Sequence, residues 1–111
     1  MGVALGQECR IKNVGVLLGP TVNLHRSPLA GRNFKAYSED PTLSGMLGAA
    51  YVNGVQSQGV SACLKHFVGN KCETNRKTSN SIIDERTLRE LYAYTFQVAL
   101  RHSDPWTVMA S

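Results

Sequence analysis

Three short runs of mainly apolar residues predict three buried strands. They cover residues 14–18, 60–67 and 106–110. The first run is apolar and β-branched, and it stops at Gly19-Pro20, which suits a strand buried on both faces better than a half-exposed strand with alternating polarity. Strands buried on both faces are typical of parallel sheets covered by helices. We therefore expect a parallel sheet.

Between the first two runs, the spacing predicts a helix over about residues 41–57. Asp40 is a suitable N-cap and Pro41 suits the first helical position. Apolar residues then recur at helical spacing, namely Leu43, Met46, Leu47, Ala50 and Val55. Gly59 follows the helix and separates it from the second strand.

A second helix is predicted between the second and third strands, and residues 1–12 resemble the tail of a further helix. Asp84 can cap the second helix, which ends near His102, where cations suit a helix C-terminus. Its expected buried stripe consists of Leu88, Leu91, Tyr92, Phe96 and Ala99.

The alternation of strands and helices predicts an α/β fold with parallel, right-handed crossovers in one domain, residues 1–111. A (β/α) barrel and a doubly wound sheet both have this pattern. No glycine-rich phosphate-binding turn follows any strand, which argues against nucleotide binding.

Polar residues gather after the first two strands. Residues 19–34 form a loop rich in hydrogen-bonding side chains, and residues 68–81 form a second long polar loop of the kind that is usually functional. Lys65 and His66 end the second strand, where a cation is hard to explain as core packing. Chemistry is therefore expected at the carboxyl ends of the strands.

Composition and charge argue against nucleic-acid binding and against a membrane-spanning protein. The chain of 111 residues is 42% hydrophobic and 18% charged, with a formal charge of +4. The cations are scattered among acidic residues, which favours a solvated surface, and a nucleic-acid-binding function would rest on charge alone. No secretory signal pattern opens the sequence, and no apolar run approaches the roughly 20 residues of a membrane span. The sequence leaves the compartment open.

The three cysteines do not predict a disulfide framework or a metal site. Cys9, Cys63 and Cys72 include no CxxC pair. Cys63, His66 and Cys72 offer three zinc ligands without a fourth at a suitable spacing, so we expect no metal and no cofactor.

The sequences of the two polar loops and of several neighbouring segments resemble glycoside hydrolase family 3, especially its fungal-type β-glucosidases. The segments that carry the resemblance are GPTVNLHRSP at residues 19–28, GRNF at 31–34, YSEDPTLSG at 37–45, KHFVGN at 65–70, DERTLRE at 84–90 and VMAS at 108–111. The resemblance therefore extends over essentially the whole chain.

The resemblance implies a fragment of a TIM-like (β/α)8 barrel with about three parallel strands, from a retaining hydrolase of terminal β-D-glucosyl residues. It implies that Arg32, Lys65 and His66 bind the sugar hydroxyls. The nucleophilic aspartate of the family lies beyond the strand that ends here, and the acid/base residue lies later still. We therefore expect no catalytic residue in the chain, no turnover by the chain alone, and the rest of the barrel and a second domain as partners. The alternative is a noncatalytic carbohydrate-binding or oligomerising module.

Each predicted sugar contact has a structural alternative. Arg32 can brace its own loop against Glu39 or Asp40, and strand alternation turns only one of Lys65 and His66 toward a pocket. Further structural roles are expected at His25 and Arg26, as loop braces, and at Trp106, as a core residue.

The sequence also departs from the family pattern. Lys35 and Lys71 stand where the family usually has glutamate, and Cys72 replaces a common polar residue. A like charge at these positions is expected to weaken the placement of Arg32 and Lys65.

Overall fold

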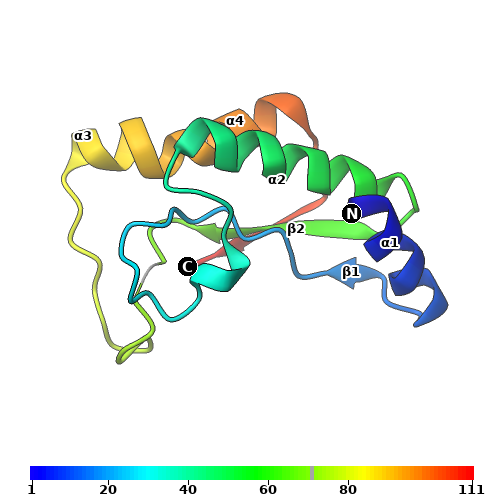
Figure 1. Cartoon of the computed structure of the whole chain (residues 1–111), viewed down its shortest axis with the longest axis horizontal. Helices are drawn as coiled ribbons and strands as arrows, with labels where there is room; N and C mark the ends of the chain where they lie inside the picture. Colours follow the sequence, from blue (N-terminus) through cyan, green and yellow to red (C-terminus); the bar gives the residue numbers. More distant parts are fainter. Residues whose placement is uncertain (71) are drawn as a thin grey trace.

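The computed structural model describes residues 1–70 and 72–111, and three parallel strands form its sheet (Figure 1). Lys71, one of the departures noted above, lies outside the described residues. The strands are β1 (Val16–Leu17), β2 (Ser61–Phe67) and β3 (Thr107–Ala110), and they lie in the order β1-β2-β3. Both pairings are parallel, as the sequence predicts.

Helices and strands alternate along the chain in the predicted order. They are α1 (Gly2–Ile11), the short 3-10 helix η1 (Asn33–Lys35), α2 (Pro41–Gln56), and one helical stretch made of α3 (Glu85–Thr87), the π-helical η2 (Leu88–Ala93) and α4 (Tyr94–His102). Helices α2 and α4 lie side by side over the same face of the sheet (Figure 1). In the described residues, no helix has both the length and the apolar character needed to cross a membrane.

The start of α2 confirms the predicted cap. The Asp40 carboxylate accepts hydrogen bonds from the backbone N–H groups of Thr42 at 2.7 Å and Leu43 at 3.1 Å. Pro41 occupies the first turn, where its missing N–H costs nothing. Asp84 caps α3 in the same way, through the N–H of Thr87 at 3.0 Å.

The face that α2 buries differs from the predicted one. Leu43, Met46 and Leu47 are between 42% and 49% exposed. Val55 is buried, as the spacing indicates, and the rest of the buried face consists of Val52 and small residues, namely Ser44, Gly45, Gly48 and Ala49. Gly45 faces α4, where an added Cβ would lie 2.6 Å from the Cβ of Val98, so this contact requires a residue without a side chain.

Two apolar clusters form the core. The first joins α1, α2 and the start of β2, and contains Cys9, Val52, Val55, Val60 and Ala62. The second joins α4 to β2 and to the loop after β1, and contains Val22, Leu64, Phe96 and Ala99. The second cluster fixes the ends of the strands where the polar loops begin.

The prediction that all three strands are buried is wrong for the two outer ones. Val16 in β1 is 44% exposed and Val108 in β3 is 50% exposed, whereas β2 is buried over most of its length. Trp106, expected in the core, is 58% exposed. The reason is position, because in residues 1–70 and 72–111 β1 and β3 are the edges of the sheet and β2 alone has a strand on both sides.

The long helical stretch confirms the second predicted helix with one local difference. Tyr92, Phe96 and Ala99 are buried as expected, but Leu91 is 42% exposed. The π-helical turn η2 lies at this point. A π turn adds a residue to the turn and so rotates the buried stripe, which a regular helical spacing does not predict.

Candidate functional site

The chain after β1 runs on beside β2 and brings the two polar loops together. The N–H of Val22 donates to the carbonyl of Lys65 at 2.9 Å, and the N–H of Lys65 donates to the carbonyl of Pro20 at 3.0 Å. The peptide bonds Gly19–Pro20 and Lys65–His66 in these segments are cis. Residues 21–23 therefore lie against the end of β2.

Asn23 holds His66 through both ends of its amide. Its Nδ2 donates to the His66 carbonyl at 3.0 Å, and its Oδ1 accepts from the His66 backbone N–H at 3.0 Å. The same Oδ1 lies 3.3 Å from His66 Nδ1. The two residues are 6% and 8% exposed, so these bonds are shielded from water and fix the imidazole in place.

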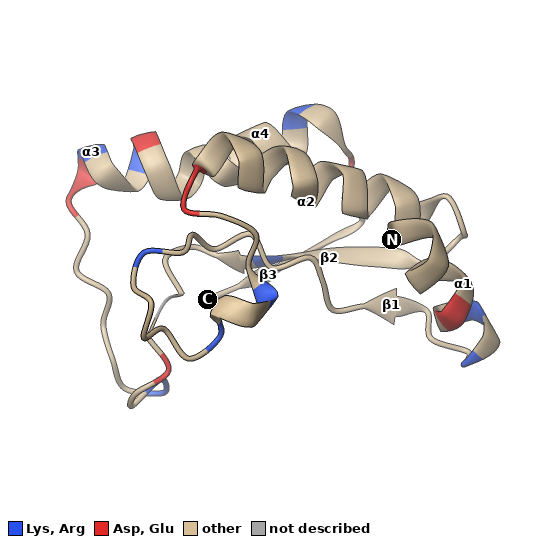
Figure 2. Ribbon diagram, in the orientation of Figure 1, with Lys and Arg blue, Asp and Glu red and all other residues tan. Residues whose placement is uncertain are grey.

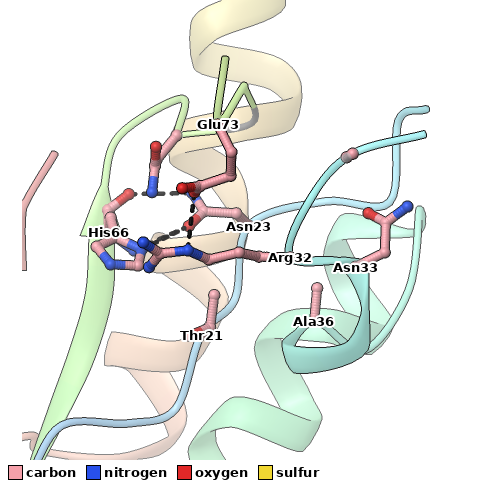
Figure 3. Close-up of a pocket in the computed structure, with 9 residues that line it drawn as sticks. Thr21, Asn23, Arg32, Asn33, Ala36, His66 and Glu73 are labelled. Carbon is pink, nitrogen blue, oxygen red and sulfur yellow. Dashed lines mark hydrogen bonds and ion pairs between the residues drawn. The ribbon is translucent and has the colours of Figure 1, made fainter. Parts of the chain in front are cut away.

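Glu73 joins the loop after β2 to the loop after β1. Its Oε1 lies 2.9 Å from Arg32 Nε, and its Oε2 lies 3.2 Å from the NH1 nitrogen of Arg76. The Arg32 and Glu73 side chains are only 28% and 24% exposed. Figure 3 shows the Arg32 guanidinium extending from its loop toward both Glu73 and His66.

These side chains surround a small cavity at the carboxyl ends of the strands (Figure 3). Its volume is about 20 Å³, which is room for about one water molecule. The cavity is therefore too small to enclose a ligand much larger than water. The lining residues are Thr21, Asn23, Ala30, Arg32, Asn33, Ala36, His66, Asn70 and Glu73.

Lys and Arg residues lie on the strand end and the loops around the site (Figure 2), and burial together with these charges favours the neutral form of His66. Burial lowers the pKa of the His66 imidazole, and the charges of Lys65 and Arg32 lower it further, while Glu73 acts in the opposite direction. Burial also lowers the pKa of Lys65, with Lys35 contributing next. The charge of Lys35 thus reaches Lys65 and His66, while its expected weakening of the placement of Arg32 and Lys65 stays a prediction.

Two of the three predicted sugar contacts meet at this cavity. Arg32 and His66 line it, whereas Lys65 does not belong to its lining. Lys65 is partly buried and close enough for the charge of Arg32 to lower its pKa. Whether these residues bind a sugar stays a prediction.

Other side chains of the first loop brace it, as expected. His25 Nε2 lies 2.7 Å from the carbonyl oxygen of Asn33, and Arg26 donates to the hydroxyl of Tyr92 at 2.9 Å. Arg32 is braced by Glu73 rather than by Glu39 or Asp40, because Asp40 is engaged in capping α2.

Sequence reasoning missed Asn23 and Glu73. Both stand within the polar loops, but their partners are 43 and 41 residues away along the chain, and no spacing rule relates them. Only the parallel pairing of the strand ends places them together. Among the described residues, no three His, Cys, Asp or Glu side chains gather in a way that could hold a metal ion.

Comparison with known proteins gives a family. The model of the glycosyl hydrolase family 3 N-terminal domain matches residues 1–111. Thermostable beta-glucosidase B of Acetivibrio thermocellus is 55% identical over 111 residues, which are 100% of this chain and 15% of that protein. The chain thus spans about 15% of the length of this relative.

Solved structures agree. Beta-glucosidase 3B from Thermotoga neapolitana, in complex with glucose, is 55% identical with a TM-score of 0.95, covering 98% of this chain and 15% of that one. Beta-glucosidase from Kluyveromyces marxianus, also with glucose, is 46% identical with a TM-score of 0.95, covering 98% of this chain and 13% of that one.

Proposed function

The chain belongs to glycosyl hydrolase family 3, and we propose that it is the part of a β-glucosidase that holds the terminal, non-reducing glucosyl residue. Its three parallel strands and their helices are a fragment of the TIM-like barrel of the family, and we assign residues 1–111 to that one domain. The observation that carries the proposal is the meeting of Arg32 and His66 at one cavity, at the carboxyl ends of parallel strands. Active sites of barrel enzymes lie at this end of the strands.

The side chains suit the recognition of a neutral sugar. The guanidinium of Arg32 and the ammonium of Lys65 donate several directed hydrogen bonds, and sugar hydroxyls can accept them. Charge-assisted bonds in a site with little water are stronger than neutral ones. The glucose complexes of the Thermotoga neapolitana and Kluyveromyces marxianus enzymes support a glucoside as the ligand.

The reacting carboxylates are assigned to other parts of the full-length enzyme. A retaining mechanism needs a nucleophile and an acid/base residue about 5 to 5.5 Å apart across the sugar. In the described part of the chain, Glu73 is the one carboxylate that lines the cavity, and two arginines engage it. Both oxygens of Glu73 are engaged by arginines, so we assign Glu73 to bracing Arg32 and not to either catalytic role.

A chimera tests the proposal. Residues 1–111 replace the matching segment of the Thermotoga neapolitana enzyme, and hydrolysis of 4-nitrophenyl β-D-glucoside is measured for the chimera, the parent enzyme and the chain alone. We expect the chimera to hydrolyse the glucoside, the Arg32→Ala chimera to lose most of its kcat/KM, and the chain alone to show no turnover.

A folded chimera without activity, beside an active parent enzyme, would refute the proposal. If that inactive chimera still bound glucose, the result would favour a noncatalytic carbohydrate-binding module. Turnover by the 111-residue chain at a rate comparable to the parent would instead refute the assignment of the carboxylates to other segments.

A further inference from the structure

The contacts of Asn23 determine which nitrogen of His66 carries the ring proton. The orientation of the Asn23 amide follows from the backbone of His66, because a carbonyl oxygen only accepts and an N–H only donates. Nδ2 must therefore face the His66 carbonyl, and Oδ1 must face the His66 N–H. If the amide were flipped, Oδ1 would face the His66 carbonyl oxygen, so that two acceptors met, and Nδ2 would face the His66 N–H, so that two donors met.

The fixed amide then acts on the ring. His66 Nδ1 lies 3.3 Å from the same Oδ1, which has no proton to donate. A hydrogen bond between them requires the proton on Nδ1. In a neutral imidazole only one nitrogen carries a proton, so Nε2 is left with a free lone pair.

Nε2 remains available to a ligand. Among residues 1–70 and 72–111, no group hydrogen-bonds this nitrogen, while His66 lines the cavity. The neighbouring charges oppose a second proton on the ring, since Lys65, Arg32 and Lys35 outweigh Glu73 around it. His66 thus offers a hydrogen-bond acceptor beside Arg32 and Lys65, which can only donate.

We propose that Asn23 is a positioning residue that holds His66 as the Nδ1–H tautomer, so that Nε2 accepts a hydrogen bond from a hydroxyl of the glycoside. The sugar part of this inference rests on the proposed function, whereas the tautomer does not. The site would then recognise one hydroxyl as a donor and others as acceptors. A substrate that carries fluorine or an ether oxygen at the first of these positions would be rejected.

The tautomer is measured on the 111-residue chain by long-range proton–nitrogen NMR of its histidine rings at neutral pH. His66 is expected to carry its proton on Nδ1. His25 is an internal contrast, because its Nε2 faces the carbonyl of Asn33 at 2.7 Å and must carry the proton there. A His66 ring protonated on Nε2 would overturn the inference, whatever the outcome with sugars.

Two variants and a matched control follow. Asn23→Ala should shift the His66 ring toward the tautomer mixture of an exposed histidine. Asn23→Asp should keep the Nδ1 proton but raise the pKa of His66, because a carboxylate favours the imidazolium. The control is Asn53→Ala, since Asn53 Nδ2 donates to the carbonyl of His102 at 3.0 Å, far from the cavity. If the control moves the His66 signals as much as Asn23→Ala does, the effect is not specific and the inference fails.

The acceptor role is tested in the chimera with deoxy- and fluoro-glucoses as inhibitors. Fluorine accepts weakly but cannot donate, so at one hydroxyl position both analogues should bind about tenfold more weakly than glucose, as expected for one lost hydrogen bond. Asn23→Ala should remove this discrimination at that position only. If the fluoro analogue binds better than the deoxy analogue at every position, His66 acts as a donor and the inference is wrong. An inactive chimera would count against the proposed function alone, because the tautomer is measured without sugar.

Discussion

The ion pair between Arg32 and Glu73 is the contact whose removal tests the site most directly. Glu73→Gln keeps the shape of the side chain and removes its charge. At about 4 Å between charge centres, and an effective dielectric constant near 20, the gross attraction is about 4 kcal/mol. The side chains are about a quarter exposed, so the net value lies between the 0.2–1 kcal/mol of surface pairs and the roughly 3–5 kcal/mol cost of breaking a buried pair.

We take about 2 kcal/mol for this loss, which corresponds to about 30-fold in kcat/KM. The assay is hydrolysis of 4-nitrophenyl β-D-glucoside by the chimera, with Glu73→Gln measured alone and in the Arg32→Ala background. Because Glu73 acts through Arg32, the second substitution should change kcat/KM less than about twofold once Arg32 is gone.

The matched control is Glu90→Gln. Glu90 pairs with Arg86 at 3.1 Å, but those side chains are 60% and 82% exposed, and exposed helical pairs of this kind contribute only about 0.3–0.5 kcal/mol. No change in kinetics is expected. If Glu73→Gln costs as much in the Arg32→Ala background as in the native one, Glu73 does not act by placing Arg32.

Three further predictions concern stability, measured by urea denaturation of the chain. Asp40→Ala should lower the free energy of unfolding by about 1 kcal/mol, because it removes the N-cap of α2; an unchanged midpoint would contradict the capping role. Gly45→Ala should lower the free energy of unfolding by roughly 1–3 kcal/mol, since a Cβ there would lie 2.6 Å from the Cβ of Val98. Gly15→Ala is the control and should not show this loss, because a Cβ there would have no atom within 4 Å. The native chain should lose stability as pH falls below about 6.5, because folding lowers the pKa of His66 and the unfolded chain therefore takes up that proton first. In His66→Gln the loss of stability at acid pH should be smaller. If the variant and the native chain have the same pH profile, His66 is not the group responsible.

Capping residues and periodicity predicted those parts of the fold that depend on residues close together in the sequence. Asp40 and Pro41 mark the start of α2 because a cap and a fixed φ act within one turn. The order of strands and helices follows for the same reason, since each element carries its own periodicity.

Features that depend on a distant partner were not predictable from spacing. The buried face of α2 depends on its contacts with α1, β2 and α4, so the helical spacing alone did not show that Leu43 and Met46 are exposed. The exposure of Trp106 follows from the place of β3 at a sheet edge.

At the site, the residue types were predicted and their connections were not. The resemblance supplied Arg32 and His66, and the structure places both at one cavity. The side chains that hold them, Glu73 and Asn23, became visible only when two loops about 40 residues apart were seen side by side.

The order β1-β2-β3 has a consequence for how the chain forms during synthesis. Among the described strands, β2 pairs with β1 and β3 pairs with β2, so each of these two strands pairs with the strand made immediately before it. Pairing of β2 with β3 joins residues about 44 positions apart, as between Cys63 and Thr107, which is a modest loop to close. Translation can therefore add β2 and then β3 one strand at a time, and the two polar loops first meet after β2 has docked on β1.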